Sequence, residues 1–141
     1  MTGKRCLMLG TVLALLVTLG CAMAGSGKSD LELIQAKMAE CVAAANSQNI
    51  DAVFSHFAED FYCPQLGDKV DFRDFVDNAK DAGFLDGLKI STDDAVITID
   101  GDTATVTPVD IQGSFGGGEG DFVAKKVNGI WMITEMDISG I

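Results

Sequence analysis

Histidine, tyrosine, tryptophan and proline are scarce in this sequence. The 141 residues include one His, one Tyr, one Trp and two Pro. A single histidine, His56, and a few dispersed cysteines do not supply the closely spaced ligands of a protein metal site. The glycine-rich segment 116–120 lacks the Gly-Lys-Ser/Thr ending of a phosphate-binding loop, so we interpret it as a flexible hairpin loop. We therefore expect neither a metal nor a cofactor.

Basic residues are also scarce. Ten Lys and Arg stand against 21 Asp and Glu, and without Lys4 and Arg5 of the N-terminal segment eight remain, which gives a formal charge of −13. A polyanion of this kind is repelled by nucleic-acid phosphates and by anionic lipid head groups. We therefore expect no nucleic-acid partner, and contact with a membrane only through an N-terminal lipid.

The one long apolar run lies near the N-terminus, at residues 7–19. It follows Lys4 and Arg5 and is too short to span a bilayer as a mature helix. This pattern is typical of a secretory signal peptide, so the sequence predicts an exported protein.

Two processing sites compete at the end of this signal. Residues 18–21, Thr-Leu-Gly-Cys, resemble a bacterial lipobox, which would make Cys21 a lipidated N-terminus. Residues 22–24, Ala-Met-Ala, fit ordinary signal peptidase, which would cut after Ala24. We assign the signal region to 1–24, ending either at the lipobox Cys21 or after Ala24, a polar tether to 25–29 and one domain to 30–141. The product would be a cell-envelope lipoprotein or a periplasmic or secreted protein.

Apolar periodicity predicts three helices in the first half of the domain. They cover about 30–46, 50–57 and 71–82. Ser29 and Glu32 form a capping-box pair before the first helix, and Asn49 can cap the second. Asp71 can cap the third helix, which Gly83 ends. The segment 61–64 between the second and third helices reads as extended.

The last third of the chain predicts four consecutive antiparallel strands. They cover 95–99, 103–112, 119–127 and 130–138. Asn128-Gly129 between two apolar runs is a strong signal for a two-residue hairpin turn. The alternation of apolar residues changes phase across Thr107-Pro108, which predicts a bulge. We therefore expect a strongly curved sheet.

Several local segments resemble the NTF2-like superfamily, whose members have a cystatin-like α+β cone. They are residues 46–52, 57–62, 67–75, 100–106 and 128–133, in this order and spacing. The superfamily includes ketosteroid isomerases, SnoaL-type cyclases and scytalone dehydratase. The resemblance implies three N-terminal helices packed on the concave side of a curved antiparallel sheet, a mostly apolar pocket, and frequent homodimers through the sheet.

The aromatic residues suggest how such a pocket would be lined. Phe57, Tyr62, Phe75 and Trp131 are the large side chains expected to face it. The leading hypothesis is non-catalytic binding of a small apolar ligand, or an accessory binding role. A purely structural dimerisation domain, with a cone packed solid by side chains, is an alternative.

A second alternative is an isomerase, dehydratase or cyclase that uses a strand carboxylate as its base. The candidates are Asp110, Glu135 and Asp137, of which the last two should share a face with Trp131. The first helix has no tyrosine to act as an oxyanion donor, and a helical projection turns His56 towards solvent. An enzyme is therefore the less favoured hypothesis.

Cys41 and Cys63 would remain in the exported domain. Export permits a disulfide between them, but the predicted helix pair could leave their Cα atoms too far apart. A Cys41–Cys63 bridge and two buried free thiols both remain open at this point.

Overall fold

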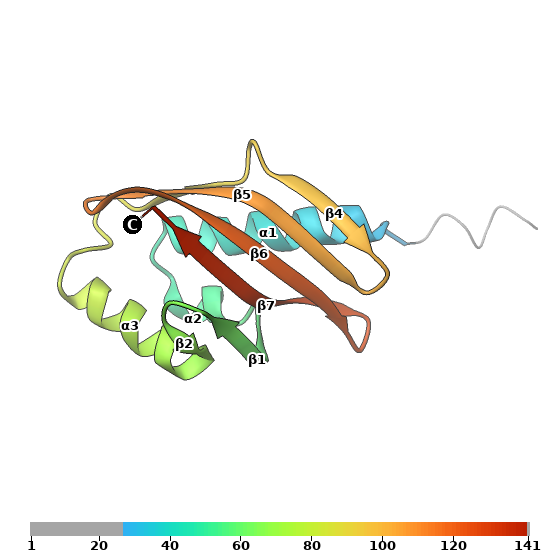
Figure 1. Ribbon diagram of the computed structural model, residues 1–141, viewed down its shortest axis with the longest axis horizontal. Coiled ribbons are helices and arrows are strands. Elements are labelled where there is room, and N and C mark those ends of the chain that lie inside the picture. Colours follow the sequence, from blue (N-terminus) through green and yellow to red (C-terminus); the bar gives the residue numbers. More distant parts are fainter. Residues whose placement is uncertain (1–26, 141) are drawn as a thin grey trace, which may run out of the picture.

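The computed structural model describes residues 27–140 (Figure 1). The predicted signal, its two candidate cleavage sites and Cys21 lie outside these residues. In chain order, the elements are α1 (Asp30–Asn46), α2 (Ile50–Phe54), β1 (Phe57–Cys63), β2 (Gly67–Asp68), α3 (Lys69–Asp81), β3 (Lys89–Ser91), β4 (Val96–Asp100), β5 (Thr103–Gly113), β6 (Gly116–Val127) and β7 (Ile130–Ser139). No helix within this part of the chain has the length and hydrophobicity needed to cross a membrane.

Helix α1 begins with the predicted capping box. The Glu32 N–H donates to Ser29 Oγ (3.2 Å), and the Ser29 N–H donates to Glu32 Oε2 (2.9 Å). Two N–H groups that the helix cannot pair internally are thereby satisfied. The buried stripe consists of Ile34, Met38 and Cys41. Its spacing of four and three residues explains why this helix could be predicted from sequence.

Helix α2 is shorter than predicted. Asn49 caps it as expected, through a hydrogen bond from the Ala52 N–H to Asn49 Oδ1, but it ends at Phe54. Phe57 begins strand β1 and pairs with Ile133 of β7 in parallel. Pairing with the sheet satisfies this segment's backbone, so tertiary structure overrides the helical periodicity.

Helix α3 begins at Lys69, two residues before the predicted start. The N-cap is Asp68, whose Oδ1 accepts from the N–H groups of Val70 (2.8 Å) and Asp71 (3.0 Å). The helix ends as predicted, with Gly83 at a φ of 78° just after the C-cap residue. A left-handed residue at this position favours glycine.

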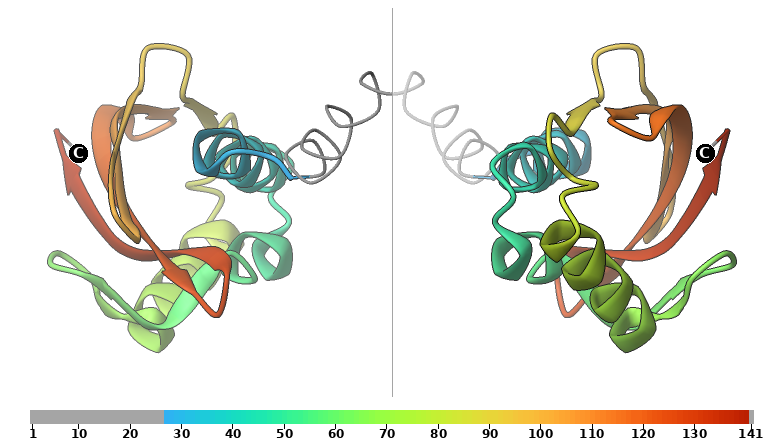
Figure 2. Two further views of the ribbon diagram at one scale, coloured as in Figure 1. Left: turned by 90° about the vertical axis from the view of Figure 1, so that its right-hand side faces the viewer. Right: turned by 90° about the vertical axis from the view of Figure 1, so that its left-hand side faces the viewer.

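The strands form one sheet in the order β2-β1-β7-β6-β5-β3, and β4 pairs with β5 beside β3. The predicted antiparallel succession from β4 to β7 is confirmed. The sheet as a whole is mixed, because β1 runs parallel to β7. Figure 2 shows the sheet curving around the helices, so that α1 and α3 cover its concave side as expected.

The hairpin turns agree with the prediction at one end of the sheet and differ at the other. Asn128 (φ 51°) and Gly129 (φ 80°) join the paired residues Val127 and Ile130, as a type I′ turn requires. The glycine-rich segment 116–120, predicted as a loop, instead begins β6 and pairs with β5. A Cβ on Gly120 would lie 3.2 Å from a carbon of the Phe122 ring, so a glycine here lets that ring pack closely over the strand.

Two irregularities lie in the antiparallel part of the sheet. The predicted one lies in β5, where pairing with β6 shifts register between Val106 and Val109. The second was not predicted and lies in β7 around Thr134, where pairing with β6 shifts register between Val123 and Ala124. Because an extra residue changes which face later side chains occupy, both strands keep apolar residues on the concave face beyond the bulge.

Candidate functional site

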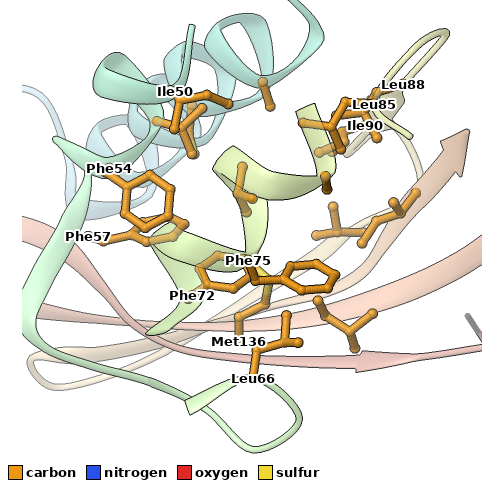
Figure 3. A pocket seen from close by; sticks show the side chains of 18 of the residues that line it. Ile50, Phe54, Phe57, Leu66, Phe72, Phe75, Leu85, Leu88, Ile90 and Met136 are labelled. Carbon is orange, nitrogen blue, oxygen red and sulfur yellow. The ribbon is translucent and has the colours of Figure 1, made fainter. Parts of the chain in front are cut away.

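A cavity of about 720 Å³ lies between the concave face of the sheet and the helices (Figure 3). Its size falls in the range of sites that bind small molecules. The lining is apolar almost throughout, and Asn78 is its one residue with a side-chain amide, hydroxyl or charge. The cavity is therefore suited to an apolar ligand.

Small side chains form part of the helical wall of the cavity. Helix α1 contributes Cys41, Val42 and Ala45 to the lining, α3 contributes Ala79, and Ala82 is the residue that caps the end of α3. None of these side chains reaches far enough to fill the space between the layers. The cavity therefore stays open beside the larger lining residues Phe72 and Phe75 of α3.

The sheet supplies the opposite wall beyond its two bulges. Val109 and Ile111 come from β5, Phe122 from β6, and Met136 and Ile138 from β7. In β5 and β7 these residues follow the register shifts. The bulges therefore place an apolar surface under the whole length of the cavity.

Stacked phenylalanines close the inner end. Phe54, Phe57 and Phe72 line the cavity, and their labelled rings lie together in Figure 3. Phe57 also stacks on Phe61, with ring centroids 4.5 Å apart and an interplanar angle of 16°. Phe57 and Phe61 are each 1% exposed, so this end is solid.

Three half-exposed phenylalanines mark the mouth. Phe75 is 49% exposed, Phe84 59% and Phe115 42%, although all three line the cavity. Two hydrogen bonds to backbone carbonyls fix the loop that carries Phe84. Ser114 Oγ donates to the Phe84 carbonyl (3.1 Å), and Gln48 Nε2 donates to the Leu85 carbonyl (3.0 Å). The mouth is thus an apolar rim held by polar contacts behind it.

Solved structures of other proteins share the fold of this chain. A protein of unknown function with a cystatin-like fold from Nostoc punctiforme PCC 73102 has a TM-score of 0.62 at 18% identity, over 77% of this chain and 89% of that one. An NTF2-like protein with a cystatin-like fold from Novosphingobium aromaticivorans has a TM-score of 0.60 at 17% identity, over 77% and 80%. The chain has the NTF2-like fold.

Another structure from Novosphingobium aromaticivorans, with the provisional name scytalone dehydratase, has a TM-score of 0.61 at 15% identity, over 77% of this chain and 81% of that one. No protein-family model and no curated protein sequence matches this chain. Similarity at these identities establishes the NTF2-like fold alone, because one fold serves many functions.

Two of the four predicted lining residues face the cavity of this NTF2-like cone. Phe57 and Phe75 line it, whereas Tyr62 and Trp131 do not. Tyr62 is 52% exposed on β1, beside the edge strand β2. Trp131 is buried at the opposite end of the sheet, where its Nε1 donates to Asp30 Oδ1 (3.1 Å). The prediction was wrong for these two because it placed them without the register of β1 and β7.

The three candidate base residues lie off the lining. Glu135 and Asp137 are exposed because the irregularity at Thr134 moves them to the face opposite Met136 and Ile138. Their predicted sharing of a face with Trp131 is therefore wrong. Asp110 lies between the lining residues Val109 and Ile111 on the other face of β5.

His56 is buried, contrary to the prediction. It is 9% exposed, and its Nδ1 has no hydrogen-bond partner in the described part of the chain. The helical projection failed because α2 ends before His56. Desolvation lowers the pKa of His56 below the ordinary 6.5, helped by Lys37 and opposed by Glu40. The residue is outside the cavity lining and thus packs as a neutral core residue.

Cys41 and Cys63 are buried free thiols, so the bridge between them is not formed. Cys41 lines the cavity, and burial raises the pKa of its thiol to about 11. Cys63 is fully buried and donates to Gln65 Oε1 (3.3 Å). Because a thiol with a raised pKa is a poor nucleophile near neutral pH, Cys41 contributes apolar surface rather than reactivity.

The side chains that usually act as general acids or bases lie outside the cavity lining, as far as residues 27–140 describe it. No Asp, Glu, His, Lys, Arg or Tyr of residues 27–140 lines the cavity. General acid–base catalysis needs such a group within hydrogen-bond reach of the substrate. Sequence reasoning missed the rim residues Phe84 and Phe115, and the available signal was large apolar side chains in segments otherwise rich in turns.

Proposed function

We propose that this chain is an exported, lipid-anchored NTF2-like protein that binds a small apolar ligand without chemically changing it. The observation that carries this proposal is the cavity of about 720 Å³ whose lining has one polar side chain, Asn78. Burial of apolar ligand surface stabilises such a complex by about 25 cal/mol per Å² before the cost of association.

The two alternative functions have less support. A catalytic base on β5 or β7 would need Asp110, Glu135 or Asp137 to face the ligand, and all three side chains belong to the opposite face. A purely structural domain would need a cone filled by its own side chains, whereas this cone is hollow near its mouth. Binding accounts for the hollow without further assumptions.

The binding proposal is tested by titrating the purified protein with N-phenyl-1-naphthylamine, whose fluorescence rises in apolar surroundings. The wild type should bind it saturably. Val76→Trp fills the cavity from α3 and should abolish binding, whereas Val70→Trp places the same ring on the exposed side of α3 and should not. Circular dichroism checks that both variants fold. Binding that survives Val76→Trp, or is absent from the wild type, would contradict the proposal.

The lipid anchor is tested separately in cells. Radiolabelled palmitate should enter the wild type and the control Cys6→Ala, since Cys6 lies in the predicted signal. Cys21→Ala should lose the label and move to the soluble fraction. A soluble, unlabelled wild type would refute the anchor and leave the binding proposal intact.

A further inference from the structure

Among the described residues 27–140, no basic side chain lines the cavity to pair with an anionic ligand. Eight Lys and Arg occur after residue 27, and none of them lines the cavity. Ligand-binding sites for carboxylates and phosphates usually supply Arg or Lys, because a charge taken out of water without a partner is costly. The absence of such a group from the lining argues against an anionic ligand.

The basic residues closest to the mouth along the chain are engaged elsewhere. Lys80 donates to the Gln48 carbonyl (3.0 Å). Arg73 pairs with Asp51 (2.6 Å) and with Asp77 (3.0 Å). Neither cation is free to turn towards a ligand without breaking a contact that holds the helices together.

Two further lysines lie near lining residues in the chain but do not line the cavity themselves. Lys89 lies between the lining residues Leu88 and Ile90, and it is exposed because alternation along β3 turns it to the opposite face. Lys37 lies on α1 one turn before the lining residue Cys41 and is itself outside the lining. A ligand inside the cavity thus meets no ammonium group from either residue.

Acidic residues adjoin the mouth in the chain instead. Asp71 lies one helical turn before Phe75, and exposed Asp81 and Asp86 flank the segment that carries Phe84. Their charges are part of the formal −13 of the chain without its N-terminal segment, so an anion approaching the rim is repelled within the Debye length of about 8 Å. The exposed phenylalanine faces would favour a cation over an anion at the same place.

Asn78 supplies the one neutral polar contact. It is an exposed residue of the lining on α3, and its side chain makes no hydrogen bond within residues 27–140. Its amide can both donate to and accept from a hydroxyl. A ligand with an apolar body inside and a neutral polar end at the mouth would satisfy this group.

We propose that the cavity selects neutral or cationic amphiphiles and discriminates against carboxylates, with the polar end of the ligand held at the mouth beside Asn78. This inference rests on the proposed binding function and names its ligand class. A long-chain alcohol or amine fits, whereas the fatty acid of the same chain length does not.

The test measures displacement of N-phenyl-1-naphthylamine by dodecanol, dodecylamine and dodecanoate below their micelle concentrations at neutral pH. Dodecanol and dodecylamine should bind at least about tenfold more tightly than dodecanoate, because only the carboxylate is an anion without a partner. Equal displacement by all three would overturn the inference while leaving the binding function standing. A protein that binds neither the probe nor any competitor would overturn both.

A variant designed to gain affinity for the carboxylate tests the same inference. Ala82→Lys places an ammonium at the exposed part of the lining, and Ala43→Lys places one on the exposed side of α1, away from the cavity. Ala82→Lys should raise the affinity for dodecanoate relative to dodecanol about tenfold over the same ratio in Ala43→Lys. An equal ratio in the two variants would contradict the inference.

A separate variant tests the role of Asn78. Asn78→Leu should weaken dodecanol binding severalfold more than it changes the binding of N-phenyl-1-naphthylamine, because only the alcohol uses the amide. Equal changes in the binding of the two compounds would show that the polar end does not lie at this residue and would overturn that part of the proposal.

Discussion

The two ends of the concave sheet face carry similar apolar residues, but one end is packed by side chains and the other lines a cavity. At the end away from the mouth, Ile34, Phe61 and Ile133 are at most 1% exposed and lie outside the cavity lining. At the other end, Ile111 and Phe122 face the cavity of about 720 Å³. Below, these are called the filled end and the hollow end.

Helix α1 is attached to a different part of the sheet at each of its ends. At the filled end, Trp131 of β7 donates to Asp30, which also pairs with Lys126 of β6 at 2.7 Å. At the hollow end, α1 carries Val42 and Ala45, and Asn46 binds the backbone of edge strand β3 through Ile90. One helix is thus fastened to the middle of the sheet at its start and to an edge at its end, and the gap between is the cavity.

The largest expected effect contrasts two Phe→Ala changes. Phe61→Ala removes a ring that is 1% exposed and should lower the free energy of unfolding by about 3–5 kcal/mol. Phe115→Ala removes a rim ring that is 42% exposed and should cost less than about 1 kcal/mol. Urea unfolding of both variants measures this. Similar losses would mean that the mouth is packed as tightly as the filled end.

A second contrast compares Ile→Ala at the two ends. Ile34→Ala creates a new void and should cost about 4 kcal/mol, whereas Ile111→Ala enlarges an existing space and should cost about 2 kcal/mol. The midpoint of urea unfolding distinguishes them. An equal loss of unfolding free energy in Ile111→Ala and Ile34→Ala would contradict this contrast.

A smaller effect separates the two ends of α1. Ser29→Ala breaks the capping box at the filled end and should cost about 1 kcal/mol. Ser47→Ala removes only a hydroxyl that donates to the Ala44 carbonyl after the last turn and should stay within about 0.5 kcal/mol. Thermal unfolding monitored by circular dichroism compares the pair, and equal losses would argue that the cap does not fix the start of α1.

The smallest effect concerns pH. Because the pKa of His56 is lowered below 6.5, the unfolded chain binds its proton first, and the free energy of unfolding should fall as the pH drops below 6.5. His56→Gln removes this contribution, so its stability should decline less than that of the wild type between about pH 7 and pH 5. Parallel urea titrations show the difference. Identical pH dependence would mean that His56 is not buried as a neutral group.

Much of this fold could be predicted from local sequence because the relevant signals are local. The Ser29 and Glu32 pair, the Asn128-Gly129 turn and the phase change at Thr107 each depend on neighbouring residues, and all three are confirmed. The antiparallel strand order followed from these turns. The NTF2-like resemblance then correctly placed the helices on the concave side.

The errors arose where distant pairing decides the outcome. The parallel pairing of Phe57 with Ile133 ended α2 early and buried His56. The shift at Thr134 turned Glu135 and Asp137 away from the cavity. Neither event has a proline or glycine to mark it, so the site could be predicted as an apolar pocket but not residue by residue.

The most direct test of the account is a methyl NMR titration of isoleucine-labelled protein with dodecanol. Ile50, Ile90, Ile111 and Ile138 line the cavity, whereas Ile34, Ile99 and Ile130 do not. Binding in the hollow end should shift the first group saturably with one affinity and leave the second group in place. Shifts confined to Ile34, Ile99 and Ile130, or no saturable shift at all, would contradict the claim that this hollow is the ligand site.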